Sequence, residues 1–281
     1  MRLAVSNIAW NEAEEPAVFT LLQQRGVTGI EVAPTRLWPD WTGATPAAAR
    51  AASARLANEG FEVPSFQAIL FAKPELSLFG DALAFVDHIS RVADLAAEFG
   101  ARRLVYGAPK SRDRGALSEA EAVARAVGVF RLAAAACTAR DTMLCVEPNP
   151  AAYGCNFVTN SSEGLALVRA VDAPGFGLHL DTAGMVLAGE DPLAALVAAR
   201  SHLHHVHASE PHLAPLAPAS IDHARIGRTL RRIGYDGWVA VEMRRADDAV
   251  AALARAVDHA RACYRDRLRL TPSEASFEAV A

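Results

Sequence analysis

Short runs rich in Val, Leu and Ile alternate with longer stretches of helical periodicity along the whole chain. The short runs are typical of buried strands, and the Ala-rich stretches between them favour helices. We predict eight strands, over residues 2–6, 29–33, 62–67, 102–106, 142–147, 176–181, 203–207 and 237–242. We predict eight helices, over residues 14–25, 46–59, 81–99, 118–140, 161–171, 192–199, 222–233 and 247–267.

This strict alternation predicts a mainly parallel α/β architecture. With eight units of each kind, a (β/α)8 TIM barrel is expected, as a single domain over residues 1–268. An open doubly wound sheet is the alternative, but no glycine-rich phosphate loop follows the first strand, where the chain has Ser6-Asn7-Ile8-Ala9-Trp10. Residues 269–281 lack a clear apolar period, so we expect a tail that is either disordered or a crossing arm.

Long loops follow the strands and short ones follow the helices. The longest predicted loops cover residues 107–117, 148–160 and 208–221. A barrel of this kind builds its active site from the loops at the carboxyl ends of its strands. The long loops therefore lie where chemistry is expected.

Composition narrows the classes of function. Hydrophobic residues make up 52% of the 281 residues, which is ample for a large core. The net charge of −4 gives no overall attraction to nucleic acid, and no apolar stretch is long enough to cross a membrane. The four cysteines show no paired short spacing, and the chain begins without a signal-peptide pattern. We expect a cytoplasmic protein with reduced thiols, and homo-oligomer formation stays open.

Four successive predicted strands end in side chains that are able to bind a metal. These residues are Glu147, Asp181, His207 and Glu242. In a closed barrel the four strand ends are neighbours, so the side chains meet at the barrel mouth. Two glutamates, one aspartate and one histidine suit a divalent ion, Mn²⁺ first, with Mg²⁺, Co²⁺ and Zn²⁺ as alternatives. Otherwise the carboxylates cap helices or form ion pairs, and the histidine is a core group.

At these positions the chain resembles the xylose-isomerase-like TIM barrel family, which includes sugar-phosphate isomerases, ketohexose 3-epimerases and endonuclease IV. Four segments carry the resemblance: Val146-Glu147-Pro148-Asn149, Leu180-Asp181-Thr182 with Met185, His207-Ala208-Ser209-Glu210, and Gly234-Tyr235-Asp236-Gly237 leading into Val241-Glu242. The resemblance implies that Glu147, Asp181, His207 and Glu242 bind one divalent metal ion.

The implied reaction is an isomerisation or epimerisation of a small sugar or sugar derivative through an enediolate. A chelated carbonyl acidifies the neighbouring C–H, and Glu147 and Glu242 serve as acid and base. The sequence leaves epimerisation and isomerisation open. A lyase or dehydratase on the same barrel and a non-catalytic sugar-binding protein are alternatives. A multi-zinc nuclease is disfavoured, because Gly184 stands where many family members have a histidine.

Eight further residues are candidates for binding substrate: Glu31, Gln67, Lys110, Arg112, Asn149, Tyr153, Asn156 and Glu210. Lys110 and Arg112 follow the fourth strand and are able to meet a phosphate or carboxylate, or else are exposed loop residues. The others follow a strand, lie in the loop after Glu147 or belong to the seventh-strand motif. His179 and His205 either orient the metal ligands or pack inside the barrel.

Overall fold

The computed structural model describes residues 1–265. Within that range, parallel strands form one sheet in the order β2-β1-β8-β7-β6-β5-β4-β3. The strands are β1 (Arg2–Ser6), β2 (Gly29–Glu31), β3 (Ser65–Phe66), β4 (Arg103–Tyr106), β5 (Met143–Val146), β6 (Phe176–Asp181), β7 (Leu203–Ala208) and β8 (Trp238–Val241). Single bridges from Gly29 to Glu62 and from Val32 to Phe66 join the two ends. The predicted (β/α)8 TIM barrel is confirmed.

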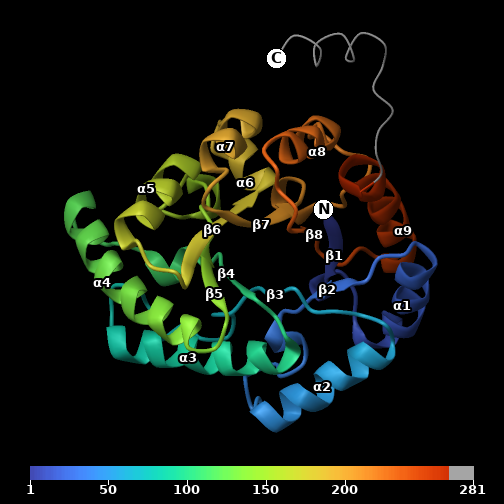
Figure 1. Ribbon diagram of the computed structural model, residues 1–281, viewed down its shortest axis with the longest axis horizontal. Coiled ribbons are helices and arrows are strands. Elements are labelled where there is room, and N and C mark those ends of the chain that lie inside the picture. The colour runs from blue at the N-terminus through green and yellow to red at the C-terminus, as the bar shows by residue number, and fades with distance from the viewer. Residues whose placement is uncertain (266–281) are drawn as a thin grey trace.

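Helices surround the strands as an outer ring (Figure 1). They are α1 (Glu15–Gln24), α2 (Pro46–Asn58), α3 (Ala82–Phe99), α4 (Glu119–Thr138), α5 (Ser161–Val171), α6 (Thr182–Leu187), α7 (Pro192–Ala199), α8 (His223–Arg232) and α9 (Ala249–Ala260). The short helix α6 was not predicted. A π-helical turn, Arg261–Arg265, follows α9. The predicted end of the last helix and the tail over residues 269–281 lie outside the described residues.

The helix boundaries follow local capping chemistry. Ser118 accepts a hydrogen bond from the backbone N–H of Glu121, whose carboxylate accepts one from the backbone N–H of Ser118, and this capping box begins α4. Asp81 caps the first N–H groups of α3, and Gly100 ends that helix in the left-handed conformation, with φ of 71°. These ends fix where each helix returns the chain to the barrel.

Strand β3 is shorter than predicted. Only Ser65 and Phe66 keep strand geometry out of the expected residues 62–67. Pro64 has no N–H group, so it cannot donate to a neighbouring strand, and the pairing on its amino-terminal side is reduced to the single bridge at Glu62.

Strand β7 carries one extra residue opposite β6. Leu203 pairs with Leu178, but His205 pairs with His179, so His204 has no partner in the register. Neighbouring paired residues face the same side of a sheet. Leu203 therefore faces the helices with Leu178, while His205 and His207 face the barrel interior.

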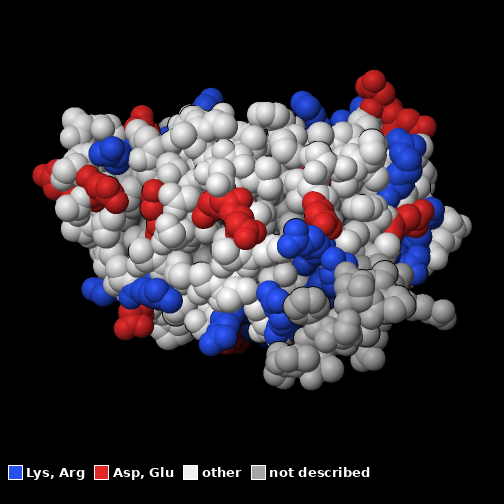
Figure 2. Space-filling view, turned by 90° about the horizontal axis from the view of Figure 1, so that it is seen from above, with Lys and Arg blue, Asp and Glu red and all other residues white. Residues whose placement is uncertain are grey.

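The surface and the cysteines agree with the composition. No helix within residues 1–265 is long and apolar enough to cross a membrane. On the face in Figure 2, acidic and basic side chains are interspersed, with much uncharged surface between them. The four cysteines are free and buried.

Candidate active site

Three of the four predicted metal ligands converge closely at the carboxyl ends of β5, β6 and β7. Glu147, Asp181 and His207 each offer a ligand atom, and these atoms all lie within 4.8 Å of one another. Glu242 follows β8, and its Oε2 lies 3.2 Å from Nδ1 of His207. The four side chains, called the cage below, thus meet at the barrel mouth as the strand-end pattern predicts.

Glu147 reaches the cage because the neighbouring strand ends in a glycine. A Cβ built on Gly107, directly after β4, would lie 1.6 Å from Oε2 of Glu147. Any other residue at position 107 would force the carboxylate to move. The backbone of Glu147 is held separately, since its N–H donates to the carbonyl of Tyr106 (3.1 Å) and its carbonyl accepts from Arg112 (2.6 Å).

Asp181 is the last residue of β6 and also the N-cap of α6. Its Oδ1 accepts the N–H of Gly184 at 2.5 Å, and its Oδ2 accepts a hydrogen bond from the hydroxyl of Ser209. Both oxygens are therefore oriented by the protein before any ligand binds. Asp181 therefore does cap a helix, which was the alternative role. It also belongs to the cage, because each carboxylate oxygen has a second lone pair that is able to bind a ligand.

The cage concentrates negative charge. Burial, together with Glu242 and Asp181, raises the pKa of Glu147 from 4.5 to about 8. Burial and Glu242 raise the pKa of Asp181 from 3.8 to about 6. Burial alone would lower the pKa of His207, but the Glu31 and Glu242 carboxylates raise it well above its usual value. In the metal-free protein these groups share protons that a cation would displace.

Glu31 orients the histidine of the cage from below. Its Oε2 lies 2.9 Å from Nε2 of His207, and its Oε1 lies 2.8 Å from Nε2 of His205. Ser65 donates a third hydrogen bond to this carboxylate at 2.7 Å. In the neutral imidazole, a carboxylate that accepts the Nε2–H leaves the lone pair on Nδ1, which is the atom that faces the cage. The two ring nitrogens of His179 are buried there without a hydrogen-bond partner among the described residues.

The residues of the cage fit a divalent cation. Within residues 1–265, Nδ1 of His207 is buried and makes no aligned hydrogen bond, although it lies beside Glu242. Three carboxylates and one imidazole give a mixed oxygen and nitrogen donor set, which suits ions such as Mn²⁺, Mg²⁺, Co²⁺ or Zn²⁺. The identity of the ion stays a prediction.

Residues 19–264 match the sequence profile described as xylose isomerase-like TIM barrel. The chain belongs to this family. The resemblance seen in the four strand-end motifs is thereby confirmed over most of the chain.

Curated relatives match over shorter stretches. A ketose 3-epimerase of Arthrobacter globiformis is 32% identical over 90 residues, which are 32% of this chain and 31% of the relative. A probable ketose 3-epimerase of Synechocystis is 31% identical over 121 residues, which are 42% of this chain and 41% of the relative. The matched stretch thus spans less than half the length of these relatives.

Solved structures of similar shape cover nearly the whole chain. A D-psicose 3-epimerase from Clostridium cellulolyticum, crystallised with D-tagatose, has a TM-score of 0.78 and 17% identity, covering 94% of this chain and 99% of its own. A 3-keto-D-glucoside 4-epimerase from E. coli has a TM-score of 0.76 and 18% identity, covering 94% and 100%. At this identity the likeness shows the fold.

Among the predicted substrate-binding residues of this xylose isomerase-like barrel, several lie beside the cage. Gln67 is buried and donates to Oε1 of Glu242 at 3.0 Å. The hydroxyl of Tyr153 accepts the backbone N–H of His212 at 3.0 Å, and Glu147, Asp181 and Glu242 contribute to raising its pKa, after burial. Lys110 is exposed in the loop after β4.

Three of these predictions do not fit the surroundings of the side chain. Arg112 is fully buried, and its guanidinium is used by the Glu147 carbonyl and by Oδ1 of Asn149 (2.7 Å), so it supports the loop after β5 instead of meeting a substrate anion. Asn149 is buried as the partner of Arg112. Glu31 has no exposed surface, because it lies inside the barrel beneath His207, so it cannot bond a sugar hydroxyl.

Two other predicted residues hold loops together. Asn156 is exposed and contacts Asp113 (2.6 Å) and the backbone N–H of Arg114 (3.1 Å). Oε1 of Glu210 lies 3.0 Å from Nε2 of His223, and its Oε2 accepts the N–H of Ser220 at 2.9 Å. Burial would raise the pKa of Glu210, but these hydrogen bonds lower it to about 2. Both residues act on the loops that frame the mouth.

Sequence reasoning missed two residues that shape the cage. Ser209, directly after β7, orients Asp181, and Gly107 makes room for Glu147. A glycine directly after a barrel strand was visible in the sequence, next to the loop that contains Lys110. Ser209 stood inside the quoted seventh-strand motif, but only the structure shows which carboxylate it contacts.

Proposed function

We propose that the protein is a divalent-metal-dependent sugar epimerase that acts on a small ketose. The observation that carries this proposal is the convergence of Glu147, Asp181, His207 and Glu242 at the barrel mouth. The names of the curated relatives, ketose 3-epimerase and L-ribulose 3-epimerase, support the same reaction class and a sugar substrate. Manganese is our first choice of ion.

In this mechanism the four residues of the cage would hold the ion. A bound ion would supply positive charge against the negative oxygen that develops on the substrate when a neighbouring C–H loses its proton. Glu147 and Glu242 are the carboxylates placed to exchange protons with that carbon. One removes the proton from one face, and the other returns a proton to the opposite face, which inverts the configuration.

The supporting residues keep both glutamates in place. Gln67 donates to Oε1 of Glu242, and this leaves Oε2 as the oxygen directed toward His207. Gly107 and the backbone contacts of Glu147 fix the other carboxylate. We assign to Tyr153, which is half-buried, the role of shielding the reacting carbon from water.

The test is proton exchange with solvent. Metal-stripped protein is incubated in D₂O with D-fructose, D-tagatose or L-ribulose, with Mn²⁺, Mg²⁺, Co²⁺ or Zn²⁺ added in turn. We expect metal-dependent deuterium at the carbon next to the carbonyl, together with the inverted sugar. Glu147→Gln and Glu242→Gln should each lower the exchange rate by at least about 10²-fold, since each removes an acid–base group.

The product separates the alternatives. Epimerisation and isomerisation preserve mass, whereas a dehydratase lowers it by one water. Glu119→Gln, on the exposed side of α4, is the matched control and should keep the wild-type rate. No exchange with any sugar or metal, in protein that binds the metal, would exclude the proposed activity.

A further inference from the structure

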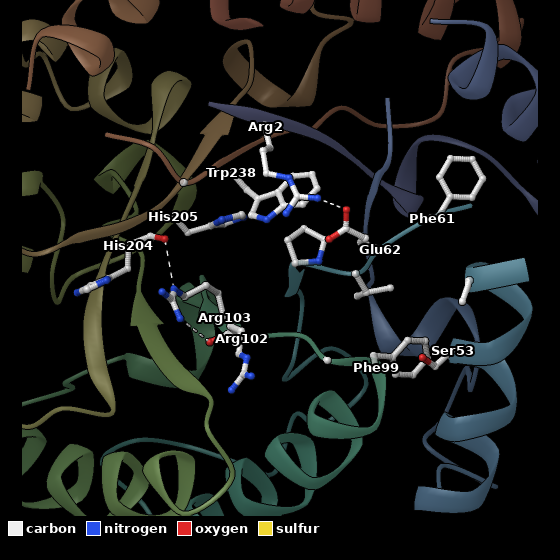
Figure 3. Close-up of a pocket in the computed structure, with 15 residues that line it drawn as sticks. Arg2, Ser53, Phe61, Glu62, Phe99, Arg102, Arg103, His204, His205 and Trp238 are labelled. Atoms are coloured by element: carbon white, nitrogen blue, oxygen red, sulfur yellow. Dashed lines mark hydrogen bonds and ion pairs between the residues drawn. The ribbon is translucent and has the colours of Figure 1, made fainter. Parts of the chain in front are cut away.

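A second site is suggested by a cavity of about 550 Å³ at the opposite end of the barrel. Its lining includes the first residues of three strands, Arg2, Arg103 and Trp238, so it opens at the amino-terminal end (Figure 3). None of the four cage residues lines it. Its volume is in the range of cavities that hold small organic ligands.

The polar groups of this cavity are mainly cationic. Among residues 1–265, Arg2, Arg102 and Arg103 line it together with a single acidic residue, Glu62. Arg2 is paired with Glu62, and Arg102 lies 3.6 Å from a carboxylate oxygen of Asp141. The lining therefore carries a net positive charge, which favours an anion.

Arg103 is the group that lacks a counter-charge. Its guanidinium donates to two backbone carbonyls, that of Arg102 at 3.0 Å and that of His204 at 3.4 Å. Across residues 1–265, no carboxylate is paired with it. The residue is half-buried, and a half-buried guanidinium with free donors is suited to phosphate or carboxylate.

An aromatic wall lies beside the arginines. The guanidinium of Arg2 lies 4.0 Å from the ring centroid of Trp238. Gly29 allows the indole to pack there, because a Cβ at that position would lie 2.3 Å from the ring. Phe61 and Phe99 belong to the lining on the other side (Figure 3). A ligand here meets both a cation and a flat apolar surface.

We propose that this cavity binds a small organic anion, with its phosphate or carboxylate group on Arg103 and its apolar part against Trp238. The site is separate from the mouth, so it does not depend on the proposed epimerase activity. Its inner wall includes His205, whose other side contacts Glu31 beneath the cage.

The test uses phenyl phosphate and benzoate as probes, titrated by calorimetry into metal-free protein so that neither probe binds through a metal ion. We expect one molecule bound per chain by at least one of the two probes, and the stronger probe identifies the preferred anionic group. Arg103→Met should weaken this binding at least about tenfold, because it removes the charged hydrogen bonds. Arg91→Met, on the exposed face of α3, is the matched control and should bind as the wild type does.

A charge-increasing variant tests the same point while leaving Arg103 in place. Glu62→Gln removes the acidic residue of the described lining, so it should strengthen binding by a few-fold at low salt. Equal binding by Arg103→Met and the wild type, weaker binding by Glu62→Gln, or no binding of either probe would overturn the proposal.

Discussion

The carboxylates of the cage should make the metal-free protein less stable as the pH rises. The pKa of Glu147 is raised from 4.5 to about 8, and that of Asp181 from 3.8 to about 6. An acid with a raised pKa in the folded state holds its proton more tightly there than in the unfolded chain. Its contribution to the free energy of unfolding is fully present below the pKa of the unfolded chain. This contribution is lost as the pH rises through the pKa of the folded protein. The loss therefore falls between about pH 4 and about pH 8.

The size of the effect follows from the pKa of Glu147. The difference between 4.5 and about 8 corresponds to at most about 5 kcal/mol. Glu147 keeps some exposure at the mouth and shares its proton with neighbouring carboxylates, so we expect roughly 2 to 3 kcal/mol. Glu147→Gln keeps the shape of the side chain without the ionisation, so it should remove this part of the loss.

The assay is urea unfolding of metal-stripped protein at about pH 5 and about pH 8.5. The free energies of unfolding of the wild type and Glu147→Gln should be similar at the lower pH. At the higher pH the variant should be more stable by roughly 2 to 3 kcal/mol. Saturating Mn²⁺ should reverse the order, because the ion binds the carboxylate and favours the folded wild type. Parallel pH profiles of the two proteins without metal would refute the reasoning.

Two further substitutions test the supports of the cage. Gly107→Ala should displace the Glu147 carboxylate and weaken Mn²⁺ binding by at least about tenfold, as measured by calorimetry. Gly128→Ala, in open space on α4, is its control and should leave binding unchanged. Arg112→Met should lower the free energy of unfolding by about 3 kcal/mol, because two buried acceptors lose their donor. Lys110→Met, a nearby exposed control, should change stability by less than about 0.5 kcal/mol, and an equal loss in both would contradict this role.

The barrel and the cage were predictable because both rest on local patterns. Each strand that ends in a charged residue could be recognised separately from the sequence. The strand order of a closed barrel then brings Glu147, Asp181, His207 and Glu242 together. The positions of these strand ends could be predicted without knowing their side-chain partners, because parallel neighbouring strands place their ends at one rim of the barrel.

The misplaced residues depend on long-range contacts. A sequence pattern cannot tell whether Arg112 points to solvent or turns back under the loop after β5, because its partners lie more than 30 residues away. Glu31 lies in a strand as predicted, but its side chain points into the barrel interior. There it contacts histidine side chains instead of the expected sugar. Helix α6 was not predicted because it is short and its N-cap is Asp181, a residue already assigned as a metal ligand.

Because His204 has no pairing partner in β6, strand β7 should tolerate the loss of a residue at this position better than at its other positions. Removing that position would restore plain pairing with β6, with Leu203 still outward and His207 still inward. Removing a residue between Leu203 and His207 at any other point would reverse the facing of one end or require the irregularity to migrate. Single-residue deletions among homologous chains are therefore expected at position 204, where they leave the facing of Leu203 and His207 unchanged.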